Sequence, residues 1–74
     1  MERKWVLKNN LKVARAEKKI SQEELAKMCG VARNTITSIE RYEYTPTAYL
    51  AAVICAALDK SFEELFYLDK EQIL

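Results

Sequence analysis

The side chains best suited to chemistry lie between residues 33 and 41 of this 74-residue chain. On a helix, Arg33, Asn34, Thr37, Ser38 and Arg41 share one face, because they stand at positions i, i+1, i+4, i+5 and i+8. This face carries guanidinium, amide and hydroxyl groups but no acid. Arg can bond N7 and O6 of guanine together, and Asn can bond adenine in the same way. The pattern predicts that Arg33, Asn34, Thr37 and Ser38 read base edges in the DNA major groove.

A preceding helix and a tight turn are predicted to position this face. Ser21 is expected to cap a helix that begins at Gln22, with Glu24 closing a capping box. The core side of this helix is expected to hold Leu25, Ala26 and Met28. Gly30 is the only glycine of the chain, and it falls where the helix must stop. Because glycine adopts a left-handed conformation at little cost, residues 21–41 are predicted to form a helix, a turn and a second helix.

The run SQEELAKMCGVARNTITSIERYEYTP, residues 21–46, resembles the helix-turn-helix of the Cro/CI-type (Xre-like) transcriptional regulators, which have the lambda-repressor-like fold. The resemblance extends over roughly residues 9–66. Its specific parts are Ser21-Gln22-Glu23, Leu25-Ala26, Gly30-Val31, Thr35-Ile36, Ile39-Glu40 and Tyr44-x-Pro46. The resemblance implies a domain that binds double-stranded DNA and regulates transcription.

The resemblance also implies roles for residues outside the reading face. In the family, the base at the position of Arg15 pairs with the acid at the position of Glu40, which implies a structural ion pair here. The family's Gln at the position of Gln22 bonds a DNA phosphate, and the free amides of the adjoining first helical turn favour the same role in this chain. The remaining residues predicted to contact phosphate or to position the reading helix are Thr35, Arg41, Tyr42, Tyr44 and Thr45.

Two positions depart from the family pattern. Ala32 stands where the family usually has a Ser or Thr that caps the reading helix, so this chain lacks that cap. Tyr42 stands where the family often has Gly, so the loop after the reading helix is expected to take a different path. In that loop, the ring of Tyr44 is expected to pack over Pro46.

Helical patterns on both sides of the motif predict an all-α fold, a compact five-helix lambda-repressor-like DNA-binding domain. A first helix is expected over about 10–18, a fourth from Thr47 through about 58, and a fifth capped by Ser61, with Phe62, Leu65 and Phe66 closing the core. The domain spans residues 9–66, with an N-terminal extension of residues 1–8 and a C-terminal tail of residues 67–74. The apolar run Trp5-Val6-Leu7 leaves three readings open: a short strand, an arm packed on the domain or on a second subunit, and a frayed end.

Composition narrows the function. The net charge is only +1, but residues 1–41 carry +5 and residues 42–74 carry −4, which is typical of a molecule with one DNA-facing side and which chance could also produce. Cys29 and Cys55 form no metal-binding pattern, and the chain has no His. With no glycine-rich loop and no nucleophile–base pair, we expect neither an enzyme nor a cofactor or metal. The sequence shows no membrane span or signal-peptide pattern, so we expect a cytoplasmic location.

These observations favour a sequence-specific transcriptional regulator, most consistent with a repressor, that binds a two-fold-symmetric operator as a homodimer. An alternative is an antitoxin-like interaction module that binds a protein partner and regulates its own gene through the same helix-turn-helix. The expected dimer interface combines the outer side of the fourth helix with the tail, through Tyr49, Val53, Ala56, Tyr67 and Leu68. Ile73 and Leu74 could join it, Trp5 to Leu7 could cover it from the other end, and the tail could instead fold back onto Val53.

Overall fold

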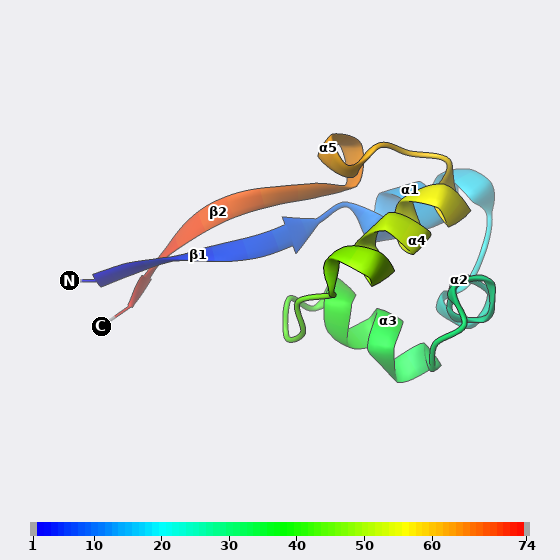
Figure 1. Ribbon diagram of the computed structural model, residues 1–74, viewed down its shortest axis with the longest axis horizontal. Helices are drawn as coiled ribbons and strands as arrows, with labels where there is room; N and C mark the ends of the chain where they lie inside the picture. The colour runs from blue at the N-terminus through cyan, green and yellow to red at the C-terminus, as the bar shows by residue number, and fades with distance from the viewer. Residues whose placement is uncertain (1, 74) are drawn as a thin grey trace.

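Five short helices form one body, and two strands project from it as a ribbon. The computed structural model describes residues 2–73, and the side chains of residues 4–71 within that range. The elements follow one another as β1 (Glu2–Asn9), α1 (Leu11–Lys18), α2 (Gln22–Cys29), α3 (Arg33–Glu40), α4 (Ala48–Leu58), α5 (Phe62–Leu65) and β2 (Phe66–Ile73). Figure 1 shows the helices gathered at one end of the molecule and both chain ends at the other.

Side-chain caps start three of the helices, at the residues predicted to do so. The Oγ of Ser21 accepts the N–H of Glu24 at 3.0 Å, and the Glu24 carboxylate accepts the N–H of Ser21 at 2.8 Å. Ser61 and Glu64 make the same reciprocal pair at the start of α5. Thr47 caps α4 by accepting the N–H of Leu50. These bonds satisfy amides that have no partner within a helix, so the positions of the helix starts follow from local chemistry.

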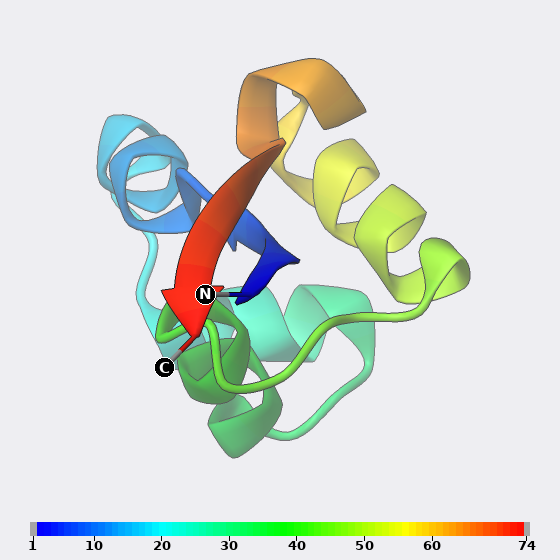
Figure 2. The ribbon, with the colours of Figure 1, turned by 90° about the vertical axis from the view of Figure 1, so that its left-hand side faces the viewer.

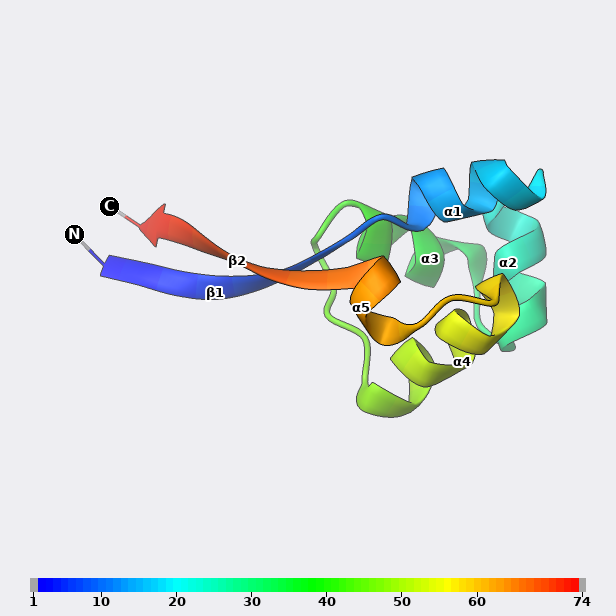
Figure 3. The same cartoon turned by 90° about the horizontal axis from the view of Figure 1, so that it is seen from above.

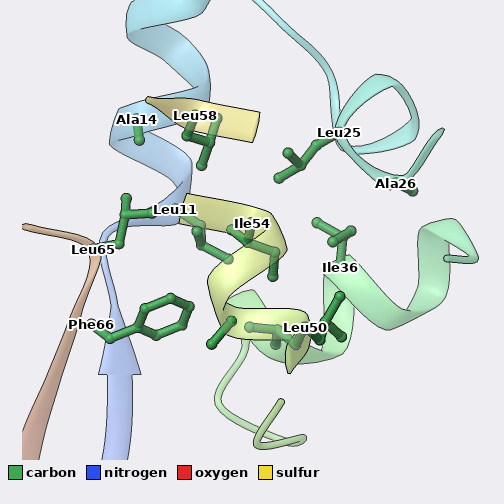
Figure 4. Close-up of a cluster of buried hydrophobic side chains, with 12 residues drawn as sticks. Leu11, Ala14, Leu25, Ala26, Ile36, Leu50, Ile54, Leu58, Leu65 and Phe66 are labelled. Carbon is green, nitrogen blue, oxygen red and sulfur yellow. The ribbon is translucent and has the colours of Figure 1, made fainter. Parts of the chain in front are cut away.

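The core lies between the five helices and the base of the ribbon (Figure 4). Its fully buried large side chains are Leu11, Leu25, Ile36, Ile39, Ile54, Leu58 and Leu65. The prediction that Met28 and Phe62 belong to the core is wrong, because each side chain is about half exposed. Phe62 instead stacks on Phe66 with ring centroids 5.1 Å apart, and Phe66 carries the contact into the core.

The five predicted helices are present, but the prediction of an all-α fold is not exact, because β1 and β2 form a two-stranded antiparallel sheet. The register pairs Asn9 with Phe66 at the base of the ribbon and Trp5 with Lys70 farther out. Of the three readings of the N-terminal extension, the structure has the strand, and its partner is the tail rather than the surface of the body. Local patterning could not reveal this pairing, since neither strand alternates apolar and polar residues along its whole length.

The ribbon sets the elongated shape of the molecule, which measures 40 × 22 × 22 Å. Seen from above, it runs away from the helices in a single direction (Figure 3). Seen along the ribbon, α1 lies on one side of it and α4 on the other (Figure 2). Its base lies beside the C-terminal end of α3, where the Nδ2 of the buried Asn9 donates to the carbonyl of Ile39 at 2.9 Å. Within the described residues, the helices are all too short or too polar to cross a membrane.

Candidate nucleic-acid interface

α3 has one buried and one exposed side, as its residue pattern predicts. Ile36, Ile39 and Glu40 are buried against the body. On the other side, Arg33 and Asn34 are exposed on the first turn, and Ser38 is half-buried one turn later. The described part of this exposed side carries no acid before Glu43, which forms an ion pair with Arg41 at 3.4 Å. The first turn of α3 therefore presents a guanidinium and an amide to solvent.

The Glu40 carboxylate accepts two hydrogen bonds from the Arg15 guanidinium. Nε of Arg15 donates to its Oε2 at 2.6 Å, and Nη2 of Arg15 donates to its Oε1 at 3.1 Å. Arg15 also donates from Nη1 to the carbonyl of Ile20 at 3.1 Å. The Glu40 side chain is only 1% exposed. A buried carboxylate with two guanidinium donors is geometrically well defined, so this pair ties α1 to the C-terminal half of α3.

Gln22 links the two helices of the motif through its amide. Its Oε1 accepts the hydroxyl proton of Thr37 at 3.0 Å, and its Nε2 donates to Oε1 of Glu40 at 3.0 Å. Thr37 is half-buried, and its hydroxyl also lies 3.2 Å from the carbonyl of Arg33. The hydroxyl proton of Thr37 is therefore already used inside the protein. Gln22 keeps a second N–H that can point outward.

An open hollow at the start of α2 is lined by Gln22, Lys27 and Arg33, together with the acids Glu23 and Glu24. Sequence reasoning missed Lys27; its only signal was a base in the last turn of α2, where it looked like a solvated surface residue. A second hollow lies along α3 and is lined by Asn34, Thr35, Ser38 and Tyr44. Most of the residues predicted to contact DNA thus line these two hollows.

The starts of the two motif helices differ. Ser21 caps α2, and the backbone N–H of Ser21 lowers the pKa of the Glu24 carboxyl below its usual range by bonding it. Ala32 at the start of α3 makes no side-chain cap, as the sequence predicted. Between them, Gly30 has a left-handed φ of +70°, and its N–H bonds the carbonyl of Lys27 at 3.2 Å. The amides of the first turn of α3 are therefore left without a side-chain acceptor.

The loop after α3 turns at Tyr42, which has a left-handed φ of +63°. Glycine adopts this conformation most readily, so the backbone turns here in spite of the larger side chain. The Tyr42 ring lies under the ammonium group of Lys8 at 5.6 Å, and its hydroxyl raises the pKa of Tyr67 by hydrogen bonding. The loop is also anchored at the carbonyl of Ser38, which accepts two loop amides. Arg41, Tyr42, Tyr44 and Thr45 are all exposed along this loop.

The residues predicted to form a dimer interface do not all share one surface. Tyr49 and Ala56 are exposed on α4, with the half-buried Val53 between them. Tyr67 and Leu68 are neighbours on β2, and neighbouring strand residues point to opposite faces. Tyr67 therefore lies on the ribbon face next to Tyr42, away from Leu68. The side chains of Ile73 and Leu74 lie outside the described side chains, and the tail pairs with β1 instead of folding back onto Val53.

No site for metal or thiol chemistry emerges within the part of the chain that the structure describes. It contains no cluster of three or more His, Cys, Asp or Glu side chains arranged to hold a metal ion. Cys29 and Cys55 are free and half-buried, and burial raises the pKa of both thiols. Both side chains pack against the core, which fits their predicted role as small apolar residues.

This chain is similar in sequence and in structure to known helix-turn-helix proteins. A family model described as Helix-turn-helix matches residues 11–65. The HTH-type transcriptional regulator YgzD of Bacillus subtilis is 40% identical over 65 residues, which cover 88% of this chain and 98% of that protein. The restriction-modification controller protein C.AhdI of Aeromonas hydrophila superposes with a TM-score of 0.69 at 30% identity, over 73% of this chain and 78% of that one. The DNA-binding domain of the P22 C2 repressor gives a TM-score of 0.68 at 32% identity, over 72% and 70%.

Proposed function

Because the chain belongs to the Cro/CI-type (Xre-like) helix-turn-helix family of DNA-binding transcriptional regulators, we propose that it reads one specific operator through the exposed first turn of α3. The observation that carries this proposal is that Arg33 and Asn34 are both exposed on the first turn of α3. Arg33 bonds a guanine and Asn34 bonds an adenine in the major groove. Ser38 reads a neighbouring base from the next turn of α3, and Thr37 belongs to the same reading face.

A second set of residues holds the domain on the DNA backbone. The free N–H of Gln22 donates to a phosphate while its other amide bonds brace Thr37 and Glu40. Lys27 lines the same hollow and adds a positive charge there, beside Glu23 and Glu24. On the other side of α3, further phosphate contacts come from Thr35, Arg41, Tyr42, Tyr44 and Thr45. Contacts of this kind set the register of the protein but carry no sequence information.

We further propose that the protein acts as a homodimer and as a repressor, in the cytoplasm where it meets the DNA. One domain of this size reads only a few base pairs, whereas a two-fold dimer sets two reading helices ~34 Å apart, one turn of DNA. We place the dimer contact within the described body and ribbon. A bound dimer that overlaps a promoter excludes polymerase.

Selection of bound DNA from a random pool tests the reading function. Wild-type protein should enrich one sequence with two-fold symmetry. Arg33→Ala and Asn34→Ala should each cost ~1–3 kcal/mol of binding to it and relax the preference at separate base positions. Lys60→Ala is the matched control, because Lys60 follows the C-terminal end of α4 and is paired with Glu17 of α1. If either reading variant bound the selected site as well as the control, that residue would lose its assigned role.

Salt titration separates backbone contacts from reading. Arg41→Ala should weaken binding to all sequences alike and lower the salt dependence by about one released ion. An unchanged slope with an altered base preference would instead move Arg41 into the reading set. A reporter gene placed behind the selected operator then tests the sign of regulation, since a repressor should lower its expression.

A further inference from the structure

The two faces of the ribbon differ in character. Because directly paired residues share a face, Trp5 with Lys70 and Leu7 with Leu68 lie on one side, which we call the apolar face. The pairs Lys4 with Glu71, Val6 with Asp69 and Lys8 with Tyr67 lie on the other side, which we call the polar face. The apolar face runs into the core, because the next pair toward the body is Asn9 with the buried Phe66.

The polar face carries charged side chains that form ion pairs with one another. Nζ of Lys8 lies 3.0 Å from a carboxylate oxygen of Asp69 and 3.4 Å from one of Glu71. These contacts raise the pKa of Lys8 and lower that of Asp69, so each group keeps its charge. Tyr67 adds its hydroxyl beside Tyr42. Lys8, Asp69 and Glu71 are therefore paired within one chain.

The apolar face is not satisfied within one chain. Trp5 is 62% exposed and Leu68 is 61% exposed, although both are large apolar side chains. The ammonium group of Lys70 lies over the Trp5 ring at 4.7 Å and covers only part of it. At the base, Phe62 continues the surface, half-exposed and stacked on Phe66. A lone two-stranded ribbon is at best marginally stable in water, so a ribbon of eight pairs with an uncovered apolar face calls for a partner.

We propose that the apolar face is covered by the apolar face of a second copy of this chain, so that two ribbons pack face to face about a two-fold axis. The proposal rests on the proposed function, since a symmetric operator requires a second copy. Nucleic acid is a poor alternative partner for this face, because Lys70 is its one base among the described side chains and lies over the Trp5 ring. An isologous contact needs a surface that matches itself, and this face meets that need because Leu7 and Leu68 are apolar and Lys70, its one charge among the described side chains, lies over the Trp5 ring.

The size and position of the ribbon fit this arrangement. The long dimension of the molecule exceeds its other two by 18 Å. Two reading helices one DNA turn apart each lie ~17 Å from the two-fold axis, so the ribbon is long enough to reach the axis. It leaves the body beside the C-terminal end of α3 (Figure 1), so Arg33 and Asn34 at the other end of that helix remain free. A second copy on the ribbon therefore does not cover the reading residues.

Two lysine substitutions on opposite faces of the same ribbon test the proposal. Leu68→Lys puts a charge in the apolar face, whereas Val6→Lys puts the same charge on the polar face beside Asp69. In sedimentation at micromolar concentration, wild type and Val6→Lys should be dimers and Leu68→Lys a monomer. Circular dichroism should show the same helix content in all three. Val53→Lys, on the outer side of α4, should remain dimeric.

Trp5 supplies an independent readout, because it is the only tryptophan of the chain. On dilution of wild type, its emission should shift to longer wavelength with a midpoint that equals the dissociation constant from sedimentation. Leu68→Lys should emit at the longer wavelength at every concentration. Trp5 emission that ignores dilution while the dimer dissociates would overturn the proposal, because the ring would then lie outside the interface.

The results also separate this proposal from the proposed function. A Leu68→Lys monomer that still binds a single half-site with the wild-type base preference supports both. A dimer that survives Leu68→Lys and is lost in Val53→Lys overturns the ribbon interface and places the contact on α4, with DNA reading intact. A wild type that is monomeric yet selects a DNA sequence also overturns the ribbon interface alone. A ribbon-dependent dimer that selects no DNA overturns the proposed function but leaves the interface standing.

Discussion

The helical body and the ribbon both contain an ion pair, but the carboxylate is buried in one pair and exposed to water in the other. In the body, Glu40 is 1% exposed and accepts two bonds from Arg15. On the ribbon, Asp69 is half-exposed and shares Lys8 with Glu71. Water and salt screen an exposed pair, whereas a buried carboxylate without its partner is costly. The body thus depends on its ion pair, and the ribbon depends on what covers its apolar face.

The largest effect that this comparison predicts follows from opening the buried pair. Arg15→Met leaves the Glu40 carboxylate buried with Gln22 as its remaining side-chain donor, so we expect a loss of ~3–5 kcal/mol in the free energy of unfolding. Lys8→Met on the ribbon should cause a much smaller change. Urea unfolding at one fixed protein concentration measures both. In a cycle with Glu40→Gln, strictly additive losses would show that Arg15 and Glu40 do not interact.

Hydrogen exchange should sharpen the comparison next. If a second copy covers the apolar face, the inward amides of β1 and β2 in wild type should exchange at a rate close to that of the core helices. In monomeric Leu68→Lys, the ribbon amides should exchange faster by a factor on the order of ten or more, while those of α2 to α4 keep their protection. Uniform acceleration throughout the chain would show instead that body and ribbon open as a single unit.

The same division explains what could be predicted from the sequence. The caps at Ser21, Thr47 and Ser61 act within one helical turn, so their helices begin where local patterns place them. The ribbon pairs Trp5 with Lys70, which are distant in the chain, and β2 places the apolar neighbours Tyr67 and Leu68 on opposite faces. No local pattern predicts such a pairing. For this reason the sequence-based prediction put Tyr67 and Leu68 on one surface, whereas the strand places them on opposite faces.

The candidate site divides in a similar way. Exposure of Arg33 and Asn34 follows from helical periodicity and could be predicted. The resemblance to the family implied the pairing of Arg15 with Glu40. The bonds from Gln22 to both Thr37 and Glu40 could not be predicted, because they depend on how α2 crosses α3. Asn9 was also missed: its Oδ1 accepts the N–H of Leu11 while its Nδ2 reaches Ile39, and only the folded ribbon brings these groups together.

Two residues with left-handed backbone provide a smaller test, one in the body and one at the ribbon. Gly30→Ala should cost about 1–2 kcal/mol through backbone conformation alone, because an added Cβ would meet nothing within 4 Å. Tyr42→Gly should change the free energy of unfolding less, since it relieves the same strain but removes the ring beside Lys8. The two variants can be compared by urea unfolding.

Tyr42→Gly should also act on the ribbon. The hydrogen bond with Tyr42 raises the pKa of Tyr67 above 10.0, so this contact stabilises the fold below pH 10 and is lost as the pH rises through the folded-state pKa. In Tyr42→Gly, the pKa of Tyr67 should fall back toward 10.0, as followed by ultraviolet titration. An unchanged pKa would show that the loop does not reach the ribbon in solution.

The smallest expected effect concerns two carboxyl groups whose pKa values are lowered for different reasons. In the body, the pKa of Glu24 is lowered chiefly by the backbone N–H of Ser21, a dipole fixed at 2.8 Å. On the ribbon, the pKa of Asp69 is lowered chiefly by the bond from the charged Lys8. Both groups contribute stability above their unfolded pKa values, near 4.5 and 3.8, and lose it as the pH falls through the lower folded values.

Raising the salt concentration should therefore move the pKa of Asp69 back toward 3.8 and leave that of Glu24 nearly unchanged, because salt screens a charge on the surface more than a short bond to a backbone amide. Carboxyl chemical shifts followed by NMR at two ionic strengths measure both groups in one sample, with Lys8→Met as the variant that should release Asp69 alone. Equal sensitivity of the two groups to salt would remove this distinction between body and ribbon.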